Sequence, residues 1–479
     1  MEKRSSIRKN TFELWILIVA LIISLPLIFS MFEHRVIHGD DLFFHAGRIR
    51  SIALELPNQF PVYMCRDWLS GLGVPAATFY PSIFLYIPAI ICKLGLSIET
   101  VYTGFLIALV FFSAMISFAG FRKFFDEKTA AVISTIYISQ SYFLFDLYHR
   151  AAVGEILGMM FLPLAIASLK NFSEQDKFKT VKTILIFSCI IESHILSALI
   201  LAGIILLYTV WNFRSIVWKK YFKIFIGTIL LNAFFIVPFL YQYQAVDVWI
   251  KYIVQEPISA DVWNHLTRPI LATEVVIFIG GICFYCEKIF WQSFFITAVM
   301  LLISLEFFHL DLIVRLFQFQ WRAFMIYSIF SAVCLGLLLT KIFVREKFLI
   351  AACVFNAFIA MFYWQSGLKY TELTDENFRT GLNYIDYAYH DISIDQFFKW
   401  QSEGLPNDGK TLPILFYEGY EVRDSTGHIL QIKPSSQHLI EVESGSIENV
   451  SVNYKGLTIF KLAFIISVAT AIIFFKELI

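Results

Sequence analysis

Long apolar runs separated by short polar segments recur along most of the chain. A helix of about 20 apolar residues is long enough to cross the ~30 Å hydrocarbon core of a bilayer. The stretch 82–96 is apolar but short and carries Pro88 in its middle, so it could be another span or a helix lying partly in the membrane, and the distribution of basic loops favours a segment that does not span. The pattern predicts twelve membrane-spanning helices, and the expected spans are 13–32, 101–120, 129–146, 156–170, 180–193, 195–211, 222–241, 269–286, 290–306, 323–341, 348–364 and 457–475.

Lys and Arg side chains gather in alternate loops of this arrangement. Cytoplasmic loops of membrane proteins carry an excess of these residues. If the basic N-terminus MEKRSSIRKN is cytoplasmic, the basic loops 121–128, 169–182, 211–220 and 341–347 fall on the same side. We therefore expect both termini in the cytoplasm, an uncleaved first transmembrane helix and a location in the plasma (inner) membrane. The longer loops then face outward, and they are 33–100, 147–155, 242–268, 307–322 and 365–456.

The segment 365–456 differs from the rest of the chain because it is polar and its second half alternates at period two. "TLPILFYEGYEV", "HILQIKP", "HLIEVE" and "ENVSVNY" are separated by the turn signals "DSTG" and "SGS". Such alternation between turns indicates short antiparallel strands. The predicted fold is an all-α polytopic membrane protein with a small extracytoplasmic β-rich domain. Its parts are a multispan core over 1–364 with the first external loop 33–100, the β-rich domain over 365–456, and a C-terminal helix over 457–479.

Composition agrees with a membrane protein. The chain has 479 residues, of which 58% are hydrophobic and 16% charged, and it contains 51 Phe. Its formal net charge is zero, so no overall field attracts nucleic acid, and we expect no nucleic-acid partner. Seven cysteines are spread along the chain, and the CxxC formed by Cys283 and Cys286 is interpreted as two small core residues.

The densest polar cluster, "HGDDLFFHAGRIR" at 38–50, follows the first apolar run. If a helix begins here with Asp40 as N-cap, then Asp41, His45 and Arg48 share one face at i, i+4 and i+7. Carboxylates near a membrane boundary can act as a general base or hold a divalent cation. A capped amphipathic helix, with Arg48 and Arg50 on lipid phosphates, is the alternative.

Two further clusters lie at the expected outer ends of apolar runs. In "DLYHRAAVGE", Arg150 and Glu155 can form an ion pair that braces a hairpin, or Arg150 or His149 can contact a phosphate. His194 lies between two apolar stretches, where ionisable groups are costly and often functional, although a structural histidine is the alternative. Glu192 lies two residues before it.

The stretch "HLDLIVRLFQFQWRAF" at 309–324 contains Asp311, Arg315 and Arg322 and reads as an interfacial helix. Arginine on the outer face is not explained by the positive-inside rule, so we expect an anionic partner. Snorkelling of these side chains to lipid headgroups is the alternative.

These motifs occur in a recognisable order. "DD..FH..RI" is followed by "FPVYMCRDWLSGLGVPAATFYPS", "DLYHRAAVGEILGMMFLPL", a mid-chain "SH", and "QFQWRAF". The order resembles the YfhO-like multispan bacterial membrane proteins and their sister group, which are related to the GT-C glycosyltransferases. The tail "LPILFYEGYEVRDSTGHILQI", a later "VNYKG" and one last span also resemble the YfhO-like C-terminal module.

The resemblance implies a glycosyltransferase that takes a sugar from a polyprenyl-phosphate donor and transfers it outside the membrane to a cell-wall or glycolipid acceptor. The catalytic acid of that family lies in the first external loop, and this role falls here on Asp40 or Asp41. Some relatives use a divalent metal such as Mg or Mn and others use none, so a metal site of Asp40, Asp41 and His45 stays open.

The residues themselves fit this chemistry. A lipid-linked donor reacts at the membrane interface, its phosphate needs cations, and the acceptor hydroxyl needs a base. We expect Arg150, Arg315 and Arg322 to hold the phosphate. The supporting residues are expected to be His45, Arg48, His149, Glu155 and His194. Two other functions are compatible with the sequence, namely a transporter or flippase of a lipid-linked intermediate and a non-catalytic membrane subunit that presents the β-rich domain.

Overall fold

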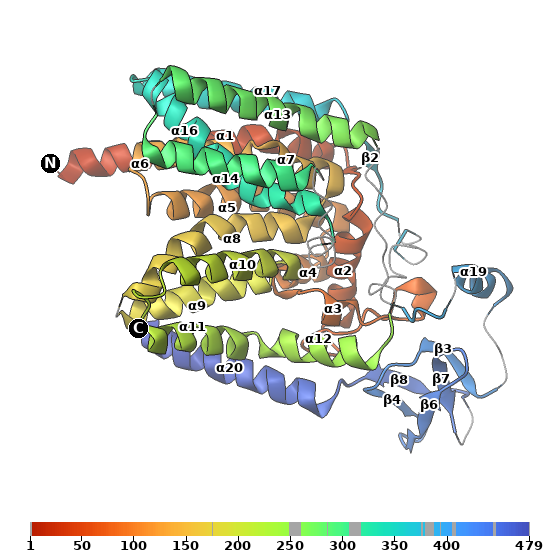
Figure 1. The fold of residues 1–479 in the computed structure, drawn as a ribbon. Helices are drawn as coiled ribbons and strands as arrows, with labels where there is room; N and C mark the ends of the chain where they lie inside the picture. Colours follow the sequence, from red (N-terminus) through yellow and green to blue (C-terminus); the bar gives the residue numbers. More distant parts are fainter. Residues whose placement is uncertain are drawn as a thin grey trace. The chain divides into compact units, whose positions relative to one another are not determined.

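The computed structural model describes a predominantly helical chain (Figure 1). The described residues are 2–174, 176–248, 260–284, 286–305, 318–374, 377–378, 388–392, 394–404, 409–443 and 447–478.

Helices of membrane-spanning length dominate the described part of the chain. Seven are long and apolar enough to cross a bilayer, and two bent pairs raise the number to nine if each pair is one span. The seven are Thr11–Phe32, Ile98–Phe121, Val153–Ser173, Trp263–Cys283, Gln320–Ile342, Glu346–Gln365 and Thr458–Leu478. The bent pairs are Glu127–Ile138 with Ser141–Arg150, at 42°, and Trp218–Leu231 with Ala233–Ala245, at 72°.

The remaining expected spans are shorter helices. The spans 195–211 and 290–306 correspond to the apolar helices Ile195–Trp211 and Lys288–Ser304, and 180–193 overlaps most of the 15-residue helix Lys177–Ile191. The short apolar helix Ile83–Lys93 rises only about 16 Å, which agrees with the expectation that 82–96 does not span. The chain is a multi-pass membrane protein by this measure, and the count of twelve spans stays a prediction.

The chain divides into two compact units, each built from separated segments. Unit 1 comprises Met1–Leu42, Tyr102–Tyr221 and Gln255–Glu372. Unit 2 comprises Phe43–Val101, Phe222–Val254 and Leu373–Ile479. This division differs from the linear one expected from the sequence, because most of the first predicted loop belongs to the same unit as the β-rich segment.

Unit 1 consists mainly of helices. In chain order its elements are α1 (Glu2–Phe32), β1 (Val36–Ile37), most of α5 (Ile98–Phe121), α6 (Glu127–Ile138), α7 (Ser141–Phe145), the π-helix η3 (Asp146–Arg150), α8 (Val153–Ser168), η4 (Leu169–Ser173), α9 (Lys177–Ile191), α10 (Ile195–Trp211), α13 (Ala260–Cys283), α14 (Lys288–Ser304), η6 (Gln320–Ala323), α16 (Phe324–Ile342), α17 (Glu346–Gln365) and β2 (Tyr370–Thr371). Helix α16 packs against α6, α13, α14 and α17, and these helices lie side by side in Figure 1.

Polar side chains join several of these helices. Ser117 of α5 and Ser134 of α6 are hydrogen-bonded at 2.8 Å, and the Thr297 hydroxyl of α14 donates to Glu274 of α13 at 2.9 Å. Such contacts between helices are favourable in lipid, where water cannot satisfy the polar groups.

Unit 2 combines helices with two small sheets. Its elements are α2 (Leu42–Glu55), η1 (Leu69–Gly71), α3 (Ala76–Phe79), η2 (Ile83–Leu85), α4 (Tyr86–Lys93), most of α11 (Trp218–Leu231), α12 (Ala233–Ala245), α19 (Ile394–Glu403), β3 (Thr411–Leu415), β4 (Tyr420–Arg423), β5 (Ile429–Leu430), β6 (Ile432–Pro434), β7 (Leu439–Val442), β8 (Ser451–Tyr454) and α20 (Thr458–Leu478). Figure 1 shows α12 and α20 lying against each other, as their contacts also indicate.

The strands form two antiparallel three-stranded sheets with orders β3-β7-β6 and β5-β4-β8. All four strand-forming stretches of the sequence appear as strands, which confirms the β-rich prediction. The predicted turn "DSTG" forms because the Asp424 carboxylate accepts hydrogen bonds from the Thr426 and His428 amides, while Gly427 adopts φ +87°. The predicted turn "SGS" lies outside the described residues.

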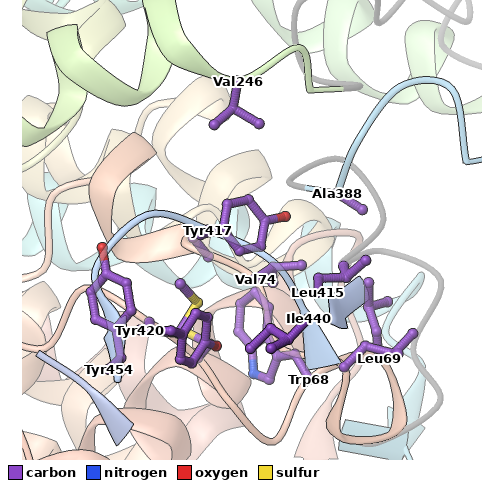
Figure 2. Close-up of a cluster of buried hydrophobic side chains, with 14 of the residues drawn as sticks. Trp68, Leu69, Val74, Val246, Ala388, Leu415, Tyr417, Tyr420, Ile440 and Tyr454 are labelled. Atoms are coloured by element: carbon purple, nitrogen blue, oxygen red, sulfur yellow. The ribbon is translucent and has the colours of Figure 1, made fainter. Parts of the chain in front are cut away.

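The core of unit 2 explains why the first predicted loop folds with the sheets. Trp68 is fully buried beside Leu415, Tyr420 and Ile440 (Figure 2). The Leu415 amide also donates to the Leu72 carbonyl at 2.8 Å. Burial of these large apolar side chains is the main stabilising contribution, at about 25 cal/mol per Å² of apolar surface.

Candidate functional site

A π-helical turn in unit 1 forms the centre of the candidate site. The helix α7 continues into η3, which ends at Ala151 in the left-handed conformation with φ +56°. The Ala152 amide donates to the Asp146 carbonyl at 2.9 Å, which closes the turn. Single π-turns are rare and occur often at functional sites. This turn places Asp146, His149 and Arg150 close to one another.

Arg150 is a buried hub that contacts three carboxyl groups. Its Nη1 donates to Asp146 Oδ1 at 2.9 Å and to Glu155 Oε1 at 2.8 Å, and its Nη2 donates to Asp41 Oδ2 at 3.2 Å. The Arg150 guanidinium also lies over the Trp321 ring, 4.7 Å from its centroid. Asp41 and Arg150 are 109 residues apart in sequence, so the hub joins the first polar cluster to the second.

Glu155 links this hub to the third cluster. Arg322 donates from Nε to Glu155 Oε1 at 3.0 Å and from Nη1 to Gln318 at 3.1 Å. Tyr142 also donates its hydroxyl hydrogen to Glu155. Glu155 and Arg322 are both buried, and their charges are compensated by each other and by Arg150.

The structure therefore contains the predicted ion pair between Arg150 and Glu155. The expected phosphate contacts of Arg150 and Arg322 stay predictions. The network contains two guanidinium groups and three carboxyl groups. It therefore offers a phosphate no surplus of positive charge while all three acids are ionised.

Asp41 lies where this network meets solvent. Its side chain is 37% exposed, whereas the Asp146 side chain is fully buried. Partial burial raises the pKa of the Asp41 carboxyl above the usual aspartate range, and the positive charge of Arg150 opposes this rise. Asp41 is therefore oriented by the protein interior and still accessible to a substrate.

Asp40 is more exposed and more loosely held. Its side chain is 67% exposed, and its carboxylate is 3.9 Å from Nδ1 of His149, at the outer limit of an ion pair. The His149 ring stacks on Phe145, with ring centroids 5.3 Å apart. The structure thus distinguishes two acids that the sequence left equivalent.

The expected N-cap at Asp40 is one residue early, since α2 begins at Leu42. Asp41 directly precedes this helix, and its carboxylate accepts a hydrogen bond from Arg150. His45 and Arg48 lie on α2 within unit 2, and both are buried.

Arg48 is engaged with backbone rather than lipid. Its Nη2 donates to the carbonyls of Tyr80 and Pro81 and to the Ser82 hydroxyl. Its guanidinium lies over the Tyr80 ring, 4.5 Å from the centroid. The alternative reading, in which Arg48 binds lipid phosphates, does not agree with this arrangement, because Nη2 donates to this loop.

The sequence left open a metal site formed by Asp40, Asp41 and His45. In the part of the chain that the structure describes, no group of three or more His, Cys, Asp or Glu side chains is arranged to hold a metal ion. His45 instead packs edge-on against Phe44 and Tyr80, with ring centroids 5.1 and 5.6 Å apart.

His194 is buried next to the network. Its Nδ1 is 3.1 Å from the Ser197 hydroxyl, and its ring lies within electrostatic reach of Glu155, Arg322 and Arg150. Arg315 and Asp311 lie outside the described residues.

Sequence reasoning missed Asp146. It ends an apolar run and lies four residues before Arg150, and this spacing, at which side chains share one face of a helix, was the available signal. Its Oδ2 atom is buried without a hydrogen-bond partner.

Sequence reasoning also missed two cationic side chains, Lys369 close to His149 and Arg268 close to His265. His265 lies within electrostatic reach of both His149 and Arg268, and Lys369 lies within reach of His149. Arg268 and Lys369 are exposed. Arg268 lies inside a predicted external loop, which could have been a signal, because the positive-inside rule does not explain it there.

Comparison with known proteins identifies a structural neighbour but no sequence family. No family model matches the chain, and no curated protein matches it. Among solved structures, the chain is similar to the arabinofuranosyltransferase AftD from mycobacteria, which was determined by single-particle cryo-EM. The TM-score is 0.44 and the sequence identity is 13%. The match covers 74% of this chain and 26% of that chain, so it extends over about a quarter of the length of AftD.

Proposed function

We propose that this chain is a membrane glycosyltransferase in which Asp41 is the general base. It transfers a sugar from a polyprenyl-phosphate donor to a cell-envelope acceptor on the extracytoplasmic face. The observation that carries the proposal is the convergence of three motifs of the resemblance in one network. Asp41, Arg150 with Glu155, and Arg322 come from three separate stretches and are joined by charge-assisted hydrogen bonds.

The proposed reaction exchanges one bond for another. The acceptor hydroxyl oxygen forms a bond to the anomeric carbon of the sugar, and the bond between that carbon and the phosphate oxygen breaks. The polyprenyl phosphate leaves with the electron pair, and Asp41 takes the hydroxyl proton. Arg150 does not touch the substrate in this scheme, since it holds the Asp41 carboxylate from the opposite side.

The donor phosphate requires cations other than the two buried arginines. The charges of Arg150 and Arg322 are neutralised by acids within the network. We therefore assign the phosphate contact to exposed Lys369 and Arg268 together with His149, which lie in the same unit as Asp41.

A transfer assay with matched carboxamide variants tests the proposal. The full-length protein in nanodiscs is supplied with radiolabelled polyprenyl-phosphate hexose and an envelope glycolipid extract. We expect Asp41→Asn to lower turnover by roughly 10²–10⁴-fold, the usual contribution of a positioned base, while donor binding persists. Asp40→Asn, which changes the neighbouring and more exposed acid in the same way, is expected to lose less than about tenfold.

Three outcomes would contradict this assignment. Wild-type turnover in the Asp41→Asn variant would remove Asp41 from the chemistry. A larger loss in Asp40→Asn would move the base role to Asp40. Movement of labelled lipid across proteoliposomes without a new glycosidic bond would favour a transporter of lipid-linked intermediates.

A further inference from the structure

We propose that Gly39 is a positioning residue for Asp41, because it lets the chain that carries the base lie directly against the π-turn. This inference rests on the proposed base role of Asp41, and it concerns a residue of the 38–50 cluster to which the sequence assigned no role. Its support is the packing of residues 36–41 between two other segments of unit 1.

The segment 36–41 is fixed by backbone hydrogen bonds on both sides. On one side, β1 pairs with β2, and the His38 amide donates to the Lys369 carbonyl at 2.8 Å. On the other side, the Asp40 amide donates to the His149 carbonyl at 3.3 Å, and the Asp41 amide donates to the Arg150 carbonyl at 2.7 Å. The Asp41 backbone and carboxylate therefore both contact Arg150.

Gly39 is the point of closest approach in this arrangement. A Cβ atom added there would lie 2.7 Å from Ala151 Cβ, 2.8 Å from Ala151 N and 2.8 Å from Arg150 C. Two of these atoms are backbone, and the π-turn holds them in place through the bond from Ala152 to Asp146. The backbone of Gly39 is not in the left-handed region, so the requirement for glycine comes from space rather than from conformation.

A side chain at position 39 must therefore displace the segment from the π-turn. Real Cβ atoms essentially never approach other atoms within 3.0 Å, so the shift must be several tenths of an ångström or more. The Asp41 carboxylate, which starts 3.2 Å from Arg150 Nη2, would then lose this contact. A misplacement of about 1 Å in a catalytic group can cost about 10²-fold in rate.

A double-mutant cycle tests this role. We expect Gly39→Ala to lower kcat about 10²-fold with little change in the KM for the donor, and to add little further loss in an Asp41→Asn background. Gly104→Ala is the matched control, since a Cβ there meets nothing within 4 Å and the residue lies within helix α5 of the same unit. It is expected to keep wild-type kinetics.

A second readout does not need transferase activity. Carbodiimide modifies protonated carboxyl groups, so its pH dependence at Asp41, followed by peptide mass spectrometry, reports the titration of that residue. Without the Arg150 contact, the Asp41 midpoint should move to higher pH in Gly39→Ala and stay in place in Gly104→Ala. The two claims can fail separately. If the wild-type protein shows no sugar transfer, the proposed function fails. If the Asp41 midpoint still moves in Gly39→Ala, the positioning role of Gly39 stands.

Several results would overturn the positioning role. These are an unchanged midpoint in Gly39→Ala, an equal loss of rate in the presence and absence of Asp41, or a Gly39→Ala chain that does not fold in either background. In the last case Gly39 would be required for the structure as a whole rather than for Asp41.

Discussion

Arg150 illustrates how burial decides what a charged side chain can do. Its side chain is 10% exposed, and a lone guanidinium there would carry a large desolvation cost. Contacts with Asp41, Asp146 and Glu155 offset that cost, so each carboxylate depends on the same cation. Any change at Arg150 should therefore be felt at Asp41.

The pH dependence of transfer tests this coupling. Asp41 can act as a base only when ionised, so activity should fall as pH drops through its pKa, which burial raises above the usual aspartate value of about 3.9. Arg150 opposes that rise, and in Arg150→Lys one ammonium group replaces the fork that reaches three carboxylates. The acid limb of the kcat/KM profile should then move to higher pH.

Arg35→Lys provides the control for this profile. Arg35 is an exposed arginine of the same unit that pairs with Glu33, so its replacement should leave the acid limb in place. An acid limb that shifts equally in both variants, or in neither, would show that Arg150 does not act on the base.

At the residue scale, the sequence carries a signal for two contacts of Arg150, those with Glu155 and with Asp146. The spacing of Arg150 and Glu155 at the end of an apolar run indicated an ion pair, which the structure contains. The contact of Asp146 with Arg150 was within reach of the sequence, since an i, i+4 spacing places both side chains on one face of a helix. The distinction between Asp40 and Asp41 was out of reach, since it depends on contacts more than 100 residues away.

Among the helices, α2 shows how one side chain can anchor a long loop. Arg48 is buried and binds three consecutive residues, Tyr80 to Ser82, through hydrogen bonds to two carbonyls and a hydroxyl. The helix thereby holds the segment that leads into the short apolar helix α4. The amphipathic reading of 38–50 did not anticipate this, because the acceptors lie on a loop with no periodic pattern.

Removal of this anchor should lower stability more than removal of a surface arginine. Arg48→Met keeps much of the side-chain volume but leaves the Tyr80 and Pro81 carbonyls without this donor. Hydrogen bonds to charged groups contribute about 1.5–3 kcal/mol each, so we expect a clear fall in the thermal unfolding midpoint in detergent. Arg35→Met should change stability by less than about 0.5 kcal/mol. Equal midpoints for the two variants would contradict the anchoring role.

The strands were predictable to a degree that the helix bends were not. Alternation at period two is a local signal, and β3, β4, β7 and β8 all form in the stretches that show it, although only β4 alternates strictly between more and less buried side chains. The bend of 72° between α11 and α12 interrupts an apolar run that reads as one span. Hydrophobicity alone carries no information about such a break.

For the whole molecule, the predicted sidedness can be measured directly. Ser173 and Ser436 are both exposed, and the register predicts that the first is cytoplasmic and the second external. Each is changed to cysteine in a background whose four less buried cysteines are replaced by alanine. A membrane-impermeant maleimide on intact cells should label position 436 and spare 173, and lysed cells should show both.

The background without an added cysteine controls for labelling of the three buried thiols. Labelling of position 173 in intact cells, with protection of 436, would invert the register. The proposed extracytoplasmic location of Asp41 would then be lost with it, whereas the network around Arg150 would be unaffected.

The division into units was the part of the architecture least accessible from sequence. Hydropathy separates spans from loops in a linear order, whereas each compact unit collects three distant segments. Long-range burial of residues such as Trp68 among the strands decides this grouping, and no local pattern of the first loop reports it.

The network around Glu155 also has a consequence for biosynthesis. A ribosome delivers the chain from its N-terminus, so Asp146, Arg150 and Glu155 are made well before Arg322, the second cation bound to Glu155. During that interval the two buried acids share one arginine, and a buried carboxylate without a compensating charge is costly. A proton on one of these acids, or shielding by the insertion machinery, would offset that cost until about two thirds of the chain has been made. Correct insertion of the early helices is in this sense completed by a residue that is synthesised late.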